Sequence, residues 1–401
     1  MRFPPLERRR RESLLTLTGR RSAPGRCPAE AHTESFRAGT LFAIWRCMAA
    51  GHRRHGRDRA FAPPDVLYAN VNAMAFGCGV SVRVERERTA RVETLPNHNV
   101  RHGIGFIDLH QDMLSGVARL EGGFPVYGSS YLSGSSRAAA IWSSLYPDAE
   151  EASLLTQLDA HDELLRSHSA SLRLVTTVDD VDAEDLRTGV LPHSEGFNLP
   201  GIEPHELDWL WTERSLRSLS LTWNYETDYG FSCYQDVAAP LKHAGQQLVR
   251  ALGESPLLLD LAHLNEAGFY QSLDLYAPPV LVSHSFARAV GDHPRGLSDE
   301  QLRALGEHGG LVGLAFVPDF LGRGSVDEAL RHIDRIVSLA GEEAISIGSD
   351  WGVTDMGELG GQTSLAGLLD AVASNYGEQL AEKFAYANAS GFLRAQLPVV
   401  V

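Results

Sequence analysis

Histidine and acidic side chains occur in this chain at spacings that suit metal binding. The segment Asp108–Asp112 reads Asp-Leu-His-Gln-Asp. In an extended strand His110 and Asp112 project from the same face, because residues two apart do so. An imidazole nitrogen and a carboxylate oxygen can then bind one cation, and both suit zinc and similar divalent ions. The His-x-Asp pair alone is a weak signal, since it occurs by chance in many proteins.

Further ligand-type residues follow short apolar runs later in the chain. They are Glu195, His263, His284 and Asp350. Each also has an ordinary structural interpretation: the histidines could be core residues bonded to carbonyls, Asp350 could cap a helix, and Glu195 could be a solvated loop acid. Their shared position at the ends of apolar runs favours a common site.

The chain from residue 104 onward predicts strands that alternate with helices. We predict eight strands, at residues 105–109, 172–178, 190–195, 216–223, 257–263, 280–284, 311–317 and 344–348. This order favours a (β/α)8 TIM-like barrel, with a doubly wound open sheet as the alternative because periodicity cannot show closure. In a barrel the carboxyl ends of the strands open on one face, where the six ligand-type side chains would meet.

Helical patterns separate several of the predicted strands. Ser298-Asp299-Glu300-Gln301 predicts a capping box, and Ser325–Glu328 repeats it. The first crossover, from Asp112 to Leu172, is long, and we expect it to carry an insertion beside the site. The other predicted helices are residues 150–167, 204–215, 236–252, 365–377 and 379–395.

These residues together resemble a known family. Over roughly residues 104–397 the chain resembles the membrane (renal) dipeptidases, dinuclear zinc enzymes of the amidohydrolase superfamily. The segments that carry the resemblance are Asp108–Asp112, Glu195-Gly196, Asp260–His263, Ser283–Ser285, His293–Arg295, Gly348–Trp351 and Asn388–Arg394. The resemblance does not cover residues 1–100.

The resemblance implies two divalent metal ions, with zinc as the expected metal. It implies that His110 and Asp112 bind the first ion, and that Asp350 lies close to it. Glu195 would bridge the two ions. The second ion would be bound by two histidines, His263 and His284.

The resemblance also implies the reaction, the hydrolysis of dipeptides. A hydroxide that bridges the metals would attack the peptide, with Asp350 as general acid and base. Arg295 would hold the substrate's C-terminal carboxylate, which suits the fork of a guanidinium. Family members are often dimers, so a homodimer is an open expectation.

Trp223 departs from the family pattern. Well-studied members carry a histidine there, in contact with the scissile carbonyl, whereas an indole N–H can donate one hydrogen bond but cannot be charged. Either Trp223 makes this contact, or Asn224 or Tyr225 replaces it, or dipeptidase activity is weak or absent. Two alternatives therefore stay open: a related amidohydrolase acting on another amide or a lactone, and a non-catalytic metal-binding barrel.

Charge divides the chain into two parts. Residues 1–100 contain 18 of the 36 Lys and Arg residues but only 9 of the 51 Asp and Glu residues. We expect residues 1–100 to be a basic extension, disordered or an overextended start, and residues 101–401 to be the dipeptidase-like barrel. The acidic body disfavours nucleic acid as a partner.

Localisation signals are weak. No apolar run approaches the ~20 residues that a membrane span needs, and the four cysteines include no Cys-x-x-Cys pair. We therefore expect a cytoplasmic protein without a membrane span. Arg8–Arg11 leaves export by an atypical N-terminal signal open.

Overall fold

The computed structural model describes residues 15–17, 34–36, 105–112, 138–145, 153–181, 187–199 and 204–398. The chain divides into two compact units, Met1–Pro96 and Asn97–Val401. In the first unit the described residues form an antiparallel pair, β1 (Leu15–Leu17) and β2 (Glu34–Phe36). The expectations for residues 1–100, including Arg8–Arg11, otherwise lie outside the described residues.

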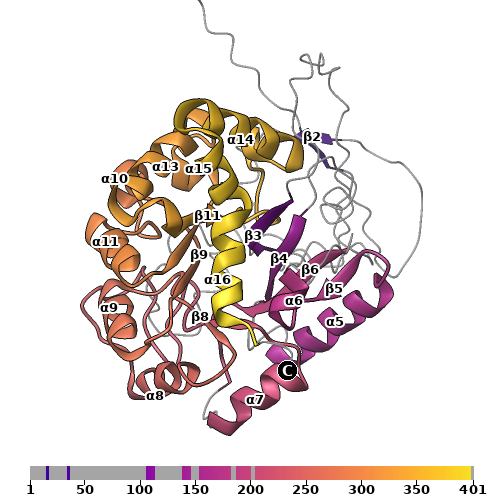
Figure 1. Ribbon diagram of the computed structural model, residues 1–401, viewed down its shortest axis with the longest axis vertical. Coiled ribbons are helices and arrows are strands. Elements are labelled where there is room, and N and C mark those ends of the chain that lie inside the picture. The colour runs from indigo at the N-terminus through magenta and orange to yellow at the C-terminus, as the bar shows by residue number, and fades with distance from the viewer. Residues whose placement is uncertain are drawn as a thin grey trace, which may run out of the picture. The chain divides into compact units, whose positions relative to one another are not determined.

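In the second unit parallel strands close into a barrel (Figure 1). The ring runs through β3, β4, β6, β7, β8, β9, β10 and β11, and β11 pairs with β3 to close it. The ring strands are β3 (Phe106–Gln111), β4 (Ala138–Leu145), β6 (Thr188–Ser194), β7 (Ser218–Ser220), β8 (Leu258–Asp260), β9 (Leu281–Ser285), β10 (Leu311–Leu314) and β11 (Ile345–Ile347). The barrel prediction is confirmed, and the open sheet is wrong.

The second strand of the ring is β4, and the prediction that residues 172–178 fill this place is wrong. Only β5 (Leu172–Leu174) is a strand in that run, and it pairs with β6 beside the ring. The β4 sequence, Ala-Ala-Ala-Ile-Trp-Ser-Ser-Leu, contains only one β-branched residue, so its strand propensity is low. Its position between β3 and β6 decides its conformation.

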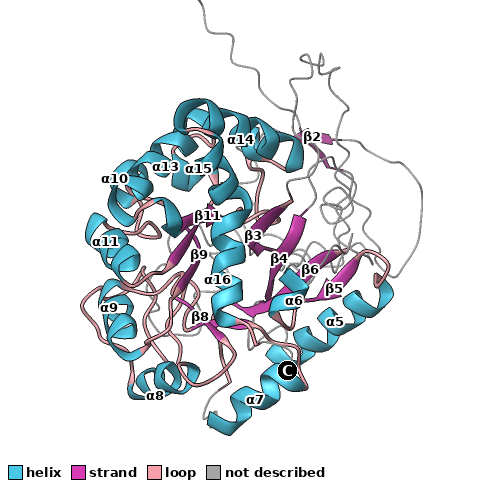
Figure 2. Ribbon diagram, in the orientation of Figure 1, coloured by secondary structure: helices cyan, strands magenta, loops and turns pink. Residues whose placement is uncertain are grey.

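Helices surround the ring of strands (Figure 2). They are α5 (Leu154–Ser167), α6 (Val178–Val181), α7 (Pro204–Thr212), α8 (His243–Leu252), α9 (Glu266–Leu275), α10 (Arg288–Gly291), α11 (Asp299–Glu307), α12 (Pro318–Leu321), α13 (Val326–Ala340), α14 (Gln362–Tyr376), α15 (Glu378–Glu382) and α16 (Asn388–Gln396). Short 3₁₀ turns η1 (Glu342–Ala344) and η2 (Gly357–Leu359) and a π-helical turn η3 (Lys383–Ala387) complete them. The predicted helix at residues 236–252 starts only at His243, because Pro240 disfavours helical backbone before it.

The capping signals hold in part. Both hydrogen bonds of the capping box between Ser298 and Gln301 are present at the start of α11. At α13 the Ser325 hydroxyl accepts from the Glu328 N–H at 3.3 Å. The Glu328 carboxylate, however, accepts from the N–H of Arg323, not from the N–H of Ser325.

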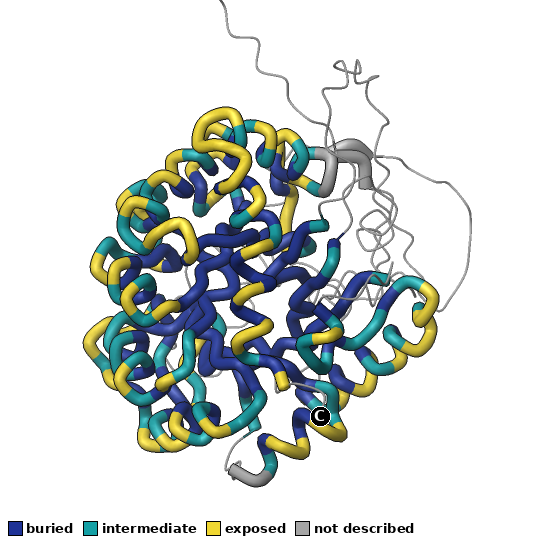
Figure 3. The backbone as a smooth tube through the Cα atoms, viewed as in Figure 1, coloured by how far each residue is buried: buried dark blue, intermediate teal, exposed yellow. Residues whose placement is uncertain are grey.

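The amino end of the barrel is covered by α16, which crosses in front of the strands in Figure 1. The Asn388 side chain donates to the carbonyl of Ile345, where β11 begins, and Gln396 donates to Pro279, just before β9. The strands are buried and exposed residues lie on the outer faces of the helices (Figure 3). The carboxyl ends of the strands, here called the mouth, lie at the opposite end from α16.

Candidate metal centre

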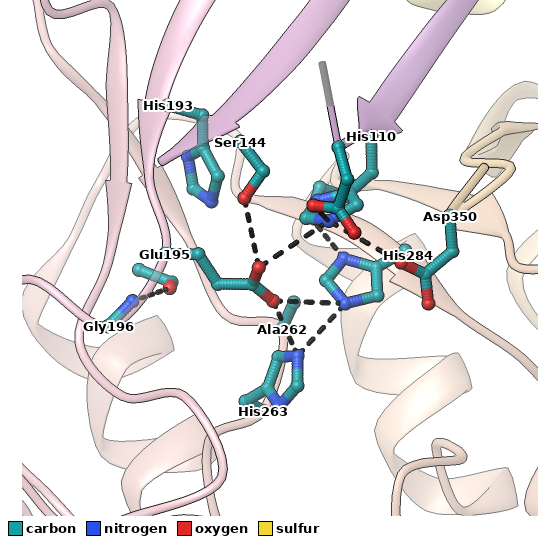
Figure 4. Close-up of polar contacts among 12 residues, drawn as sticks. His110, Ser144, His193, Glu195, Gly196, Ala262, His263, His284 and Asp350 are labelled. Atoms are coloured by element: carbon teal, nitrogen blue, oxygen red, sulfur yellow. Dashed lines mark hydrogen bonds and ion pairs between the residues drawn. The ribbon is translucent and has the colours of Figure 1, made fainter. Parts of the chain in front are cut away.

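The six ligand-type residues come together at the mouth, and all are buried. Figure 4 labels His110, Glu195, His263, His284 and Asp350. His110 and His284 lie within β3 and β9, and the other four lie in the first residues after a strand. Their ligand atoms form three overlapping groups, with the atoms of each group within 4.8 Å of one another. The groups are His110, Asp112 and Glu195; Glu195, His263 and His284; and His110, His284 and Asp350.

Glu195 lies between two sets of imidazoles. Its Oε1 atom is 2.6 Å from Nε2 of His263 and 3.3 Å from Nε2 of His284, whereas Oε2 is 3.5 Å from Nε2 of His110. Burial opposes ionisation of Glu195, but its interactions with the imidazoles of His110 and His263 outweigh burial and hold the pKa of this carboxyl well below its usual range. A carboxylate whose two oxygens face different ligand sets can bridge two cations.

His110 and Asp350 form the other side of the centre. Nε2 of His110 lies 3.6 Å from Oδ1 of Asp350 and 3.9 Å from Oδ1 of Asp112. Neither ring nitrogen of His110 has a hydrogen-bond partner within the described residues. A buried imidazole of this kind beside buried carboxylates is costly without a cation, so these residues fit a metal ion.

The histidines His263 and His284 have the protonation state and ring orientation that metal binding requires. Burial and the nearby charge of Arg295 lower the pKa of each to about 3, so both rings are neutral at pH 7, as ligands must be. Nδ1 of His263 lies 3.0 Å from Oδ1 of Asn224, and Nδ1 of His284 lies 2.9 Å from Oγ of Ser283. These contacts leave both Nε2 atoms facing Glu195.

The backbone at the mouth is unusual at three positions. His263 and Asp350 have φ values of 65° and 60°, in the left-handed region that few non-glycine residues adopt. Gly196 has φ 73°, and a Cβ atom there would lie 2.9 Å from Cβ of Trp223. Glycine is therefore required directly after Glu195.

Arg295 and Trp223 lie beside the histidine side of the centre. Arg295 is 4% exposed, and its guanidinium donates to the carbonyl of His284 at 3.3 Å. The Trp223 ring is centred 6.4 Å from the ring of His263 and 5.6 Å from that of Tyr225. Asn224, one of the expected replacements for the carbonyl contact, contacts His263 instead.

Several residues at the centre were not predicted from the sequence. The hydroxyl of Ser144 donates to Oε2 of Glu195 at 2.9 Å, and it lies on β4, the strand that the sequence pattern missed. His193, two residues before Glu195, lies 3.3 Å from Asp260. Asp108 and Asp260 belong to the motifs singled out above, but hydrogen bonds to other strands give them roles that local sequence does not show.

Comparison with known proteins identifies the family. A family model described as membrane dipeptidase (peptidase family M19) matches residues 124–396. The chain belongs to this family. The match includes Glu195, His263, His284 and Asp350, whereas His110 and Asp112 precede it. The predicted family and enzyme class, a metallodipeptidase hydrolase, are confirmed, and the family and the donor set together indicate a divalent metal.

Relatives of this M19 chain include both sequences and solved structures. A Klebsiella pneumoniae protein encoded 5′ of pqqA is 30% identical over 256 residues, which cover 60% of this chain and 92% of that protein. A metallopeptidase from Rhodobacter sphaeroides, solved with a phosphinate mimic of the dipeptide L-Ala-D-Ala, is 25% identical with a TM-score of 0.62. Dipeptidase AC, of family M19, gives the same identity and TM-score. The two structures cover 73% of this M19 chain, and 99% and 98% of their own chains.

Among the helices that the structure describes, none has the length and apolar character needed to cross a membrane.

Proposed function

We propose that this M19 protein hydrolyses dipeptides at a centre of two divalent metal ions, with zinc as the expected metal. The observation that carries the proposal is the position of Glu195, whose two carboxylate oxygens face different ligand sets. The similar Rhodobacter sphaeroides metallopeptidase, solved with a mimic of L-Ala-D-Ala, supports a dipeptide as the substrate.

The ligands divide between the two ions as follows in this proposal. His110 and Asp112 hold the first ion, with Asp350 close to it, and His263 and His284 hold the second. Glu195 bridges them, and Ser144 fixes one of its oxygens. When bound, the ions supply an activated water as the nucleophile and polarise the scissile carbonyl.

Asp350 is proposed as the group that accepts the proton of the attacking water and returns it to the leaving amine. Its side chain is 9% exposed, against 1% for Glu195 and 0% for Asp112, so a substrate reaches it most easily. Burial and the charge of Glu195 raise the pKa of Asp350 to about 7, against the opposing charge of Arg295.

Two residues are proposed to bind the substrate itself. Arg295 lies close enough for its charge to act on His263, His284 and Asp350, and its guanidinium would hold the C-terminal carboxylate of the dipeptide. Trp223, beside His263, would donate its indole N–H to the scissile carbonyl. An N–H aimed at a developing oxyanion contributes about 3 kcal/mol in other hydrolases.

The experiment joins metal analysis to a substrate panel. The purified protein would be reconstituted with zinc, analysed for bound metal, and assayed on dipeptides that include L-Ala-L-Ala and L-Ala-D-Ala, with and without chelator. We expect two zinc ions per chain and hydrolysis that the chelator abolishes and zinc restores. Failure to bind metal after reconstitution would contradict the metal centre, and binding without turnover of any dipeptide would contradict the substrate.

A related amide or a lactone is the second candidate substrate, and the presence of Trp223 favours it. The position that carries a histidine in the well-studied dipeptidases here carries a side chain that cannot be charged. The Arg295→Ala variant separates the two candidates, because a substrate without a carboxylate does not need the guanidinium. A wild-type kcat/KM that is higher for a lactone than for any dipeptide, and that Arg295→Ala leaves unchanged, would support a lactone as the natural substrate.

A further inference from the structure

Asp108, in the middle of β3, accepts hydrogen bonds from the backbone of two segments that carry proposed ligands. Its Oδ1 atom accepts from the N–H of His110 at 3.2 Å and from the N–H of Ser349 at 2.8 Å, and Ser349 directly precedes Asp350. Its Oδ2 atom accepts from the Ser349 hydroxyl at 2.5 Å and from the Gln111 amide at 2.7 Å. One carboxylate therefore fixes β3 to the loop after β11.

Asp260, at the carboxyl end of β8, repeats this arrangement on the other side of the barrel. Its Oδ1 atom accepts from the N–H groups of Ala262 and Ser283, each at 2.9 Å. Ala262 directly precedes His263, and Ser283 directly precedes His284. Its Oδ2 atom lies 3.3 Å from Nε2 of His193. This carboxylate therefore fixes the loop after β8 to β9.

The two aspartates share a geometry but no partner. Both are fully buried, and each uses Oδ1 for two backbone N–H groups from different segments of the chain and turns Oδ2 towards side chains. The bonds of Asp108 reach the backbone of His110 and the residue before Asp350. Those of Asp260 reach the residues before His263 and His284. Asp108 therefore contacts the segments of the first metal position proposed above, and Asp260 contacts those of the second.

We propose that Asp108 and Asp260 are positioning residues, each of which sets the affinity of one metal position independently of the other. The inference rests on the proposed two-metal function. Residues that orient metal ligands without touching the metal typically change metal affinity by ~10–100-fold when they are replaced. Loss of either carboxylate should therefore weaken one position by this factor and leave the other unchanged.

The test measures zinc binding to metal-free protein by competition with a chromophoric chelator. The variants are Asp108→Asn and Asp260→Asn, which keep the shape of the side chain. Asp180→Asn is the matched control, because Oδ2 of Asp180 accepts from the N–H groups of Thr176 and Thr177, at 2.8 Å each, without touching a ligand. The wild type and this control should bind two zinc ions alike.

Reference variants assign the two binding steps. His110→Ala should remove the first position and His263→Ala the second. We expect Asp108→Asn to weaken, by ~10–100-fold, the step that His110→Ala lacks, and Asp260→Asn to weaken the step that His263→Ala lacks. Equal weakening of both steps by either variant, or unchanged binding in both, would overturn the inference.

Two further comparisons keep the result interpretable. If an aspartate variant does not fold, Ser349→Ala and His193→Gln remove only one contact of Asp108 and of Asp260, and the same selectivity is expected from them. A wild-type chain that binds one zinc ion or none would contradict the proposed two-metal function, and this inference with it. Two bound ions with unselective variants would contradict this inference alone.

Discussion

The amide oxygen of Asn224 lies 3.0 Å from Nδ1 of His263, so this imidazole donates to Asn224 and presents Nε2 to Oε1 of Glu195. Asn224 directly follows Trp223, the residue that departs from the family pattern. The same loop after β7 therefore contains Trp223, the proposed contact to the substrate carbonyl, and Asn224, which orients His263, a proposed metal ligand.

Replacing Asn224 by alanine should weaken zinc binding by about 10-fold or more, because His263 loses the acceptor that fixes its ring. Competition with a chromophoric chelator measures the affinity. Tyr225→Phe is the control, since Tyr225 is 50% exposed and adjacent in sequence. Wild-type zinc affinity in Asn224→Ala would show that the contact with His263 does not orient the ring.

Asp350→Asn should retain the fold and most of the bound metal but lower kcat by ~10²–10⁴-fold, because the amide cannot accept the proton of the attacking water. Metal analysis and steady-state kinetics on the same preparation measure both properties. Asp112→Asn makes a useful comparison, since it should lose metal as well as activity. Retained turnover in Asp350→Asn would remove Asp350 from the proposed chemistry.

Arg295→Ala should lower kcat/KM for dipeptides by roughly 10–100-fold, since a charged hydrogen bond contributes about 1.5–3 kcal/mol. Dipeptides with an amidated C-terminus should show a much smaller difference between the wild type and the variant. Because Arg295 is buried, circular dichroism and zinc content must first show that the variant is folded. An equal loss on free and amidated substrates would argue against a carboxylate contact.

The stability of the fold should depend on His161 below neutral pH. Burial in α5 lowers the pKa of His161 to about 4 from 6.5, so the unfolded chain binds a proton at a higher pH than the folded chain does. Stability is therefore unaffected by this group above pH 6.5, falls as the pH drops towards 4, and loses roughly 3 kcal/mol in all.

His161→Leu should remove this part of the acid sensitivity. Urea unfolding of metal-free protein at pH 7.5 and pH 4.5 gives the difference for the variant and the wild type. His243→Leu, at an exposed position, is the control. An identical fall in the free energy of unfolding for His161→Leu and the wild type would refute the assignment to His161.

The sequence predicted seven of the eight ring strands and missed β4. The runs before Glu195, His263 and His284 each begin with two or three consecutive apolar residues, and each corresponds to a strand of the ring. The Ala-rich β4 has no such pattern, because pairing with β3 and β6 decides its conformation. Because β4 was not predicted, Ser144, which lies on this strand and contacts Glu195, was not predicted either.

The supporting contacts of the centre could not be predicted for a related reason. Ser349 is 241 residues from Asp108 in the chain, and Ser283 is 23 residues from Asp260. The local sequence around a buried aspartate indicates only that the side chain needs hydrogen-bond donors. It does not indicate which strand or loop supplies them. The types of the proposed ligands and their order along the chain can be read from the sequence. The residues that orient them are brought into contact only when the barrel closes.

The left-handed backbone conformation at His263 and Asp350 lowers the stability of the fold at two residues that the proposed function needs. Backbone strain of this kind costs about 1–3 kcal/mol at each position, and glycine would relieve it at once. Engineering this enzyme for thermal stability alone would therefore favour glycine at two residues proposed for the metal centre. A more heat-resistant and inactive barrel is the expected product of such a search, unless zinc binding is selected together with stability.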